Sequence, residues 1–189
     1  LIILLSLIAL ALIWALISYL AFMKAIGRRP DIPFEVLEQT PDTAWCRFSK
    51  EIREGMSWIE SMPKTTLTTL SHDGLKLYAT LIEQKEPKAT LLMFHGYRSA
   101  GMNDFSCAAK FYYSLGFNLL IVDQRAHGRS EGKYIGFCAT EPFDCQTWAN
   151  LIYERYGKEL PMLITGISMG GATVLMASSL DLPENLVAI

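Results

Sequence analysis

Residues 161–171 read PMLITGISMGG, an apolar run that leads directly into the pentapeptide Gly166-Ile167-Ser168-Met169-Gly170. Small residues follow, so the stretch predicts a strand, a sharp turn and a helix. In that context the Gly-x-Ser-x-Gly pattern is typical of a nucleophile elbow, which holds a serine hydroxyl above a sheet edge. Gly166 and Gly170 are needed because the turn leaves no room for side chains beside the serine. We therefore expect Ser168 to be a catalytic nucleophile, with a purely structural turn as the alternative.

The chain around this pentapeptide alternates between strand-like and helix-like segments. Short apolar runs that suit buried strands are residues 90–94, 118–122 and 161–167. Segments of helical length are residues 103–115, 141–156 and 170–180. Residues 65–70 and 75–81 alternate in polarity around an Asp-Gly turn, which predicts a hairpin, and residues 185–189 begin one more strand. The succession predicts an α/β fold with a mostly parallel sheet and helices on both faces.

A second candidate element follows the strand predicted at residues 90–94. His95-Gly96-Tyr97 begins a loop there, and a glycine at a strand exit lets backbone amides face a developing oxyanion. We assign the oxyanion hole to the backbone N–H groups of Tyr97 and Met169. An ordinary strand-to-helix turn is the alternative.

Three motifs together resemble those of the α/β-hydrolase superfamily. They are His95-Gly96-Tyr97, the run DQRAHGRSEG at residues 123–132, and GISMGG at residues 166–171. The chain is similar in particular to bacterial membrane-anchored members grouped with serine aminopeptidase-like and lysophospholipase-like proteins. The resemblance covers residues 65–189 and implies the N-terminal part of that fold, without its C-terminal part. Ala126 stands where the usual pattern has a glycine.

In this superfamily the catalytic triad follows the order Ser, then Asp or Glu, then His. The three histidines, His72, His95 and His127, all precede Ser168, so we expect none to be the base. His72 is expected to be a surface turn residue, and the resemblance implies structural roles for His95 and His127. The triad acid and base are expected beyond Ile189, and the 189-residue segment alone is expected to be inactive.

The carboxylates near these motifs have structural interpretations. Asp123 ends an apolar run two residues before Arg125, which favours a local ion pair or a loop anchor over acid–base chemistry. Glu141 and Asp144 share a predicted helix face and could pair with Arg125 or Arg129. Apart from the proximity of Glu141 and Asp144, nothing in the sequence supports a glycosidase that uses paired carboxylates.

Residues 1–23 carry no charge and, as a helix, would span roughly 34 Å, enough to cross a bilayer. The run is longer than the core of a signal peptide, so we expect an uncleaved anchor, with a buried core helix as the alternative. Residues 24–63 are expected to form a juxtamembrane segment with one helix, and residues 64–189 a partial hydrolase domain. Lys24, Arg28 and Arg29 favour a cytoplasmic domain. The chain has no initiator Met, so we expect a further N-terminal flank and leave the side open.

Composition excludes other function classes. Lys and Arg number 17 against 19 Asp and Glu, so the net charge is −2 and no basic stripe suits nucleic acid. The four cysteines, Cys46, Cys107, Cys138 and Cys145, show no metal-ligand spacing. Buried free thiols are expected, although an even count permits disulfides in an oxidising compartment. No metal or organic cofactor is expected.

These observations predict a membrane-anchored serine hydrolase that cleaves carboxylic esters of lipids or small acyl compounds through an acyl-enzyme. A site tethered at a bilayer meets acyl lipids at high effective concentration, which favours a lipid substrate. A serine peptidase of the aminopeptidase-like type is one alternative. A noncatalytic, membrane-tethered interaction domain with the hydrolase fold is the other.

Overall fold

Six strands form one sheet in the order β1-β2-β4-β3-β5-β6 in the computed structural model, which describes residues 1–189. The strands are β1 Thr65–Leu70, β2 Lys76–Ile82, β3 Ala89–Phe94, β4 Phe117–Asp123, β5 Met162–Gly166 and β6 Leu186–Ala188. β2 pairs antiparallel with β1 and β4, and the other three pairs are parallel. The predicted mostly parallel sheet, its hairpin and strands at the three apolar runs are thus confirmed, although β5 alternates between buried and half-buried residues whereas β3 and the centre of β4 are fully buried.

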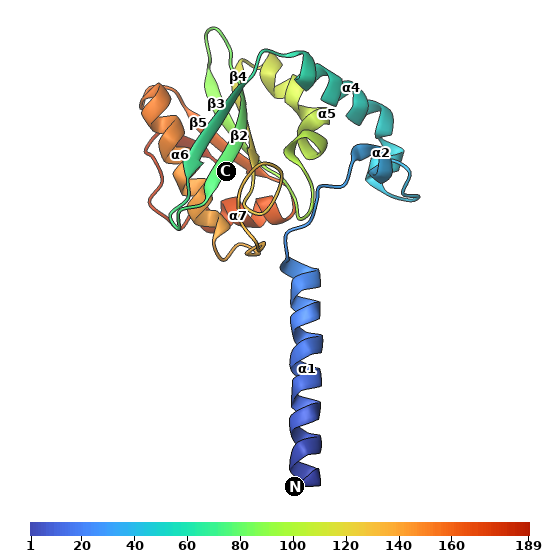
Figure 1. Ribbon diagram of the computed structural model, residues 1–189. Coiled ribbons are helices and arrows are strands. Elements are labelled where there is room, and N and C mark those ends of the chain that lie inside the picture. Colours follow the sequence, from blue (N-terminus) through green and yellow to red (C-terminus); the bar gives the residue numbers. More distant parts are fainter.

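Helices cover both faces of this sheet (Figure 1). On one face α4 (Ser49–Ser61) and α5 (Gly101–Ser114) enclose a core with Leu91, Met93 and Leu119. On the other face α6 (Glu141–Tyr156) and α7 (Met169–Ala177) enclose a core around Leu92 and Trp148. All six residues of β3 are buried, as expected for a central strand with helices on both sides.

The order of the strands places a topological switch point between β3 and β5. The chain leaves β3 through α5 on one face and leaves β5 through α7 on the other. The two strands are parallel neighbours, and Phe94 at the end of β3 pairs with Gly166 at the end of β5. Loops that diverge at such a point leave a crevice at the carboxyl edge of the sheet, where ligands of α/β proteins bind.

The prediction of a single juxtamembrane helix is wrong. Residues 34–61 form three helices, α2 (Phe34–Leu37), α3 (Ala44–Arg47) and α4. Pro41 and Asp42 interrupt the first two, because Asp42 adopts a left-handed φ of +59° that no helix continues. Helix α4 packs closely on α5: a Cβ at Gly55 would overlap the carbonyl oxygen of Ser106. Its buried Ile59 belongs to the core beneath α5.

Helix α1 (Ile2–Ile26) extends away from the rest of the molecule (Figure 1). None of its 25 residues is buried, and at 1.5 Å per residue it is about 37 Å long. This helix is long and apolar enough to cross a membrane. Its C-terminal end lies against the sheet domain, where Gly27 forms a β-bridge with Tyr134.

Candidate active site

Ser168 lies in the tight turn between β5 and α7, at the switch point. Its φ of +53° and ψ of −114° are strained for a residue with a side chain, and the residue is exposed. A Cβ at Gly170 would overlap the carbonyl oxygen of Phe94, and one at Gly166 would overlap the backbone of Gly170. The turn therefore requires both glycines and presents the Ser168 hydroxyl at the sheet edge.

The loop after β3 lies directly beside Ser168. A Cβ built on Gly96 would be 3.5 Å from the Cβ of Ser168. The Gly96 N–H donates to Asp104 Oδ2 at 2.6 Å, whereas the N–H groups of Tyr97 and Met169 have no hydrogen-bond partner within the chain. The two amides assigned to the oxyanion hole are thus free donors. Tyr97 belongs to the loop after β3, and Met169 directly follows Ser168 in the chain. Their use in catalysis stays a prediction.

His95 joins this loop to β4 and α7 and uses both ring nitrogens for backbone contacts. Its Nδ1 lies 2.8 Å from the Gly96 carbonyl oxygen, and its Nε2 accepts the Gln124 N–H at 3.1 Å. Gln124 donates back to the His95 carbonyl and accepts from the hydroxyl of Thr173 in α7. Burial lowers the pKa of His95 below its usual value, so the ring is neutral. This arrangement leaves His95 no nitrogen for catalysis.

His127 holds the same loop from the other side. Its Nδ1 lies 3.0 Å from the Arg125 carbonyl oxygen, and its Nε2 accepts the Arg98 N–H at 3.0 Å. Burial, followed by the neighbouring His95, lowers the pKa of His127 to about 4. Only a neutral ring can accept at Nε2 while donating from Nδ1. His127 is therefore placed to order the loop.

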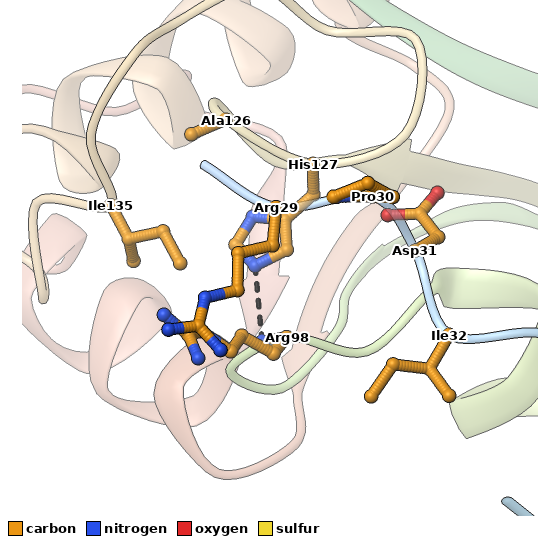
Figure 2. Close-up of a pocket in the computed structure, with 8 residues that line it drawn as sticks. All are labelled: Arg29, Pro30, Asp31, Ile32, Arg98, Ala126, His127 and Ile135. Carbon is orange, nitrogen blue, oxygen red and sulfur yellow. Dashed lines mark hydrogen bonds between the residues drawn. The ribbon is translucent and has the colours of Figure 1, made fainter. Parts of the chain in front are cut away.

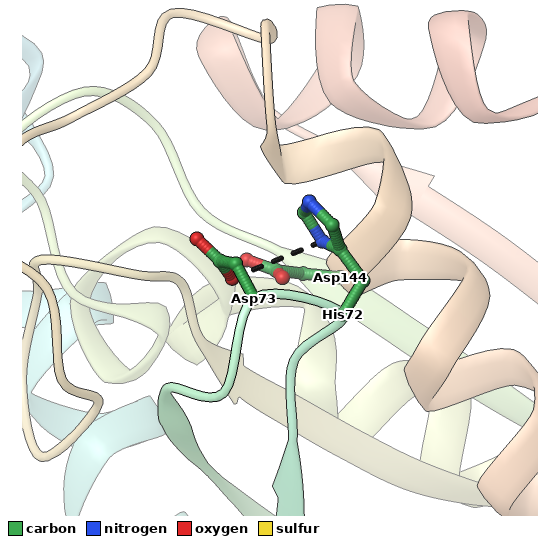
Figure 3. Close-up of side chains that lie close together, drawn as sticks. All are labelled: His72, Asp73 and Asp144. Atoms are coloured by element: carbon green, nitrogen blue, oxygen red, sulfur yellow. Dashed lines mark ion pairs between the residues drawn. The ribbon is translucent and has the colours of Figure 1, made fainter.

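Arg125 is buried between two carboxylates. Its Nε and Nη2 each donate to Asp144 at 2.6 Å, and its Nη1 and Nη2 each donate to Asp73 at 3.0 Å. The bonds from Arg125 hold the pKa of Asp73 well below its usual range. His72 lies at the exposed edge of this group, with its Nδ1 3.8 Å from Asp73 (Figure 3). Arg125 already occupies both oxygens of each carboxylate with hydrogen bonds, so His72, Asp73 and Asp144 do not form a ready cation site.

Asp123 forms a local ion pair and loop anchor as expected, but its partner is Arg129 and not Arg125. Asp123 accepts from the Arg129 Nε at 2.7 Å, and Arg129 also donates to the hydroxyls of Thr66 and Thr80. Ala126 takes a left-handed φ of +61°, so the chain turns after Arg125, and Arg129 beyond the turn lies next to Asp123. Ala126 stands at the position where the resemblance has a glycine.

Glu141 pairs with neither arginine. Its carboxylate accepts the backbone N–H groups of Gly136 and Cys138 at 2.6 and 2.9 Å, so it shapes the loop before α6. The cysteine expectation is half right. All four thiols are free, and Cys138 and Cys145 are buried, but Cys46 and Cys107 are exposed.

Sequence reasoning missed the contact between the end of α1 and the loop beside Ser168. The Tyr97 hydroxyl donates to the Ala25 carbonyl oxygen at 2.5 Å, and Arg98 Nη2 donates to that of Lys24 at 2.5 Å. Arg28 donates to the carbonyl oxygens of Ser130 and Gly128. No short-range pattern links these segments, which are about 70 to 100 residues apart.

A small pocket lies at this junction (Figure 2). Its volume is about 200 Å³. Its lining comes from the segment after α1, the loop after β3, the loop after β4 and Ile135; the residues are Arg29, Pro30, Asp31, Ile32, Arg98, Ala126, His127 and Ile135.

Comparison with known proteins identifies the family to which this fold belongs. Residues 85–189 match the family described as serine aminopeptidase, S33. The chain belongs to this family. It is therefore an α/β hydrolase, and the expected superfamily is confirmed.

Proteins similar to this S33 family member include an uncharacterised protein and two esterases. It is 28% identical over 117 residues to the uncharacterised protein YqkD of Bacillus subtilis, covering 62% of the chain and 38% of YqkD. The esterase Pf2001 of Pyrococcus furiosus is 25% identical, with a TM-score of 0.58 over 64% of the chain and 48% of Pf2001. A carboxyl esterase from Bacillus coagulans shares the fold at 19% identity, with a TM-score of 0.53 over 64% of the chain and 41% of that enzyme. The chain thus spans less than half the length of these relatives.

Proposed function

We propose that this chain is part of a membrane-anchored serine hydrolase that cleaves carboxylic esters of lipids or small acyl compounds. The observation that carries the proposal is the strained, exposed Ser168 with two unpartnered backbone N–H groups beside it. The esterases among the structural neighbours and the apolar helix α1 favour an ester of a membrane lipid.

In the proposed reaction the Ser168 Oγ attacks the ester carbonyl carbon and loses its proton to a histidine. The oxyanion accepts hydrogen bonds from the N–H groups of Tyr97 and Met169, each of which stabilises the transition state by about 2.7 to 4 kcal/mol. The C–O bond then breaks, and the histidine returns the proton to the leaving alcohol. Water hydrolyses the acyl-enzyme by the same steps in reverse roles.

The proposal takes the base and its orienting acid from beyond residue 189. His95 and His127 bind backbone groups through both nitrogens, and His72 lies at the β1–β2 turn among Asp73 and Phe143. We therefore assign none of these three histidines as the catalytic base.

Fluorophosphonate labelling of the natural full-length protein tests the nucleophile. We expect label on Ser168, its loss in Ser168→Ala, and its retention in the control Ser178→Ala, an exposed serine at the end of α7. If a folded protein takes no label, or Ser168→Ala keeps it, the nucleophile assignment is wrong and the noncatalytic domain becomes the better explanation.

Two substrates distinguish the proposed esterase from the aminopeptidase-like alternative. A monoacyl lipid and an aminoacyl arylamide would be compared with the same preparation. Preference for the lipid supports the proposal, and preference for the arylamide supports the aminopeptidase-like alternative.

Alkaline carbonate extraction of membranes tests the anchor. We expect the full-length protein to resist extraction and a variant without residues 1–26 to be extracted.

A further inference from the structure

The C-terminal end of α1 has backbone carbonyl groups that the helix itself does not pair. The last four carbonyl groups of a helix lack a helical partner, and in α1 they belong to residues 23–26. The Gly27 and Ile135 N–H groups bind the first and the last of these, at 3.0 and 2.7 Å. The second and third, on Lys24 and Ala25, accept hydrogen bonds from side chains.

The loop that follows β3 supplies most of these donors. The Tyr97 hydroxyl donates to the Ala25 carbonyl oxygen at 2.5 Å. The Arg98 Nη2 donates to the carbonyl oxygens of Lys24 and Ala25, at 2.5 and 3.2 Å, and Arg29 adds one bond to that of Lys24. The Arg98 Cζ lies 4.9 Å from the centroid of the Tyr97 ring, so the two side chains also contact each other. Two neighbouring residues of this loop thus cap α1.

A second set of contacts fixes the end of α1 against the sheet domain. Gly27 forms its β-bridge with Tyr134, and the Arg28 N–H donates to the Lys133 carbonyl oxygen at 2.8 Å. The Arg28 guanidinium donates to two further carbonyl oxygens of the loop after β4, at 2.5 and 2.7 Å. The bridge begins one residue after the helix ends, so no linker separates α1 from the domain. The helix end is therefore a fixed support for the loop that caps it.

The supported loop carries one of the two N–H groups assigned to the oxyanion hole, that of Tyr97. Arg98 adopts a left-handed φ of +53°, which is unfavourable for a residue with a side chain and has to be held. His127 holds its N–H, and α1 holds its guanidinium (Figure 2). The backbone angles on either side of the Tyr97 N–H set its direction. That direction matters, because a misplacement of about 1 Å can lower a rate about a hundredfold.

We propose that the end of α1 holds the oxyanion hole in its working geometry, with the Tyr97 hydroxyl and the Arg98 guanidinium as positioning groups. This inference rests on the proposed function and adds to it a role for α1 beyond attachment to a membrane. A helix that served only as a tether would leave hydrolysis of a soluble ester independent of these two side chains. A helix that supports the site makes the hydrolysis depend on both.

Hydrolysis of para-nitrophenyl acetate by the natural full-length protein in an uncharged detergent tests the inference, because this soluble ester needs no membrane. Titration with a fluorophosphonate counts the active sites, so kcat refers to folded enzyme alone. We expect Tyr97→Phe to lower kcat about fivefold and Arg98→Gln about tenfold, with KM unchanged, since a neutral and a charge-assisted hydrogen bond are lost. Arg98→Lys should restore part of the loss.

Two matched controls distinguish these contacts from any change of an exposed side chain. Tyr134→Phe removes the hydroxyl of another exposed tyrosine at the same junction, and Arg47→Gln removes an exposed arginine of α3. Both should match the unmodified protein. Unchanged kcat in either Tyr97→Phe or Arg98→Gln would overturn the inference, as would an equal loss in the controls or a change in KM alone.

Hydrogen–deuterium exchange of the full-length Ser168→Ala variant separates this inference from the proposed function. The peptide with residues 96–100 contains the hydrogen-bonded N–H groups of Arg98 and Ser99. We expect it to exchange faster when Tyr97→Phe or Arg98→Gln is added, and unchanged exchange would overturn the inference. If exchange responds while the natural protein takes no label and hydrolyses no ester, the contact with α1 stands and the proposed function fails.

Discussion

The Nε2 of His127 accepts the backbone N–H of Arg98 at 3.0 Å, so a loop that follows β4 holds the loop that flanks Ser168. The interaction needs a neutral imidazole, because a protonated Nε2 would point a hydrogen at the amide hydrogen. The contact is thus sensitive to pH, although His127 is not placed as a catalytic base.

Acid should weaken the folded domain through His127. Its pKa is about 4 in the folded state against about 6.5 unfolded, so the unfolded state binds protons first as pH falls. The stabilisation is complete above pH 6.5 and is lost between about 6.5 and 4, up to about 3 kcal/mol. Thermal unfolding of the detergent-solubilised protein against pH measures this. His127→Asn should flatten the slope, and an unchanged slope would contradict the assignment.

Removing Arg125 should be severe because Asp144 would be left buried and unpaired. We expect Arg125→Met to destabilise the protein by about 3 to 5 kcal/mol. Adding Asp144→Asn should recover much of the loss, since the buried charge is then gone. Denaturant unfolding of the single and double variants gives the coupling. Simple additivity of the two effects would mean that the pair does not act as a unit.

Gly170 and Gly171 provide a matched test of the elbow. An alanine at Gly170 would collide with the Phe94 backbone, whereas one at Gly171 meets only the Gly166 carbonyl oxygen, at 3.2 Å. We expect Gly170→Ala to cost more than about 3 kcal/mol and abolish Ser168 labelling, and Gly171→Ala to cost about 1 kcal/mol or less. Denaturant midpoints measure both, and equal effects would refute the steric argument.

The four thiols should divide into two classes. Burial raises the pKa of Cys145 to about 12 and raises that of Cys138 above its usual value, which suppresses the thiolate. Iodoacetamide should therefore modify Cys46 and Cys107 in the native protein, and the other two only after unfolding. Peptide mass spectrometry identifies the sites. Native labelling of Cys145 would show that α6 does not pack as described.

The sequence by itself determined the local elements and the elbow. Short apolar runs bounded by turn residues predicted the central strands, and the Gly-x-Ser-x-Gly pattern between a strand and a helix predicted the tight turn at Ser168. The 25-residue apolar helix is likewise a local property of composition.

Tertiary structure decided which distant groups meet. The partners of Arg125 are 19 and 52 residues away, and no local rule could choose Asp144 and Asp73 over Asp123. The contact of Arg98 with the end of α1 spans 74 residues. Such pairings depend on strand order and on which face each helix covers, because side chains meet only after the sheet has brought their loops to one edge.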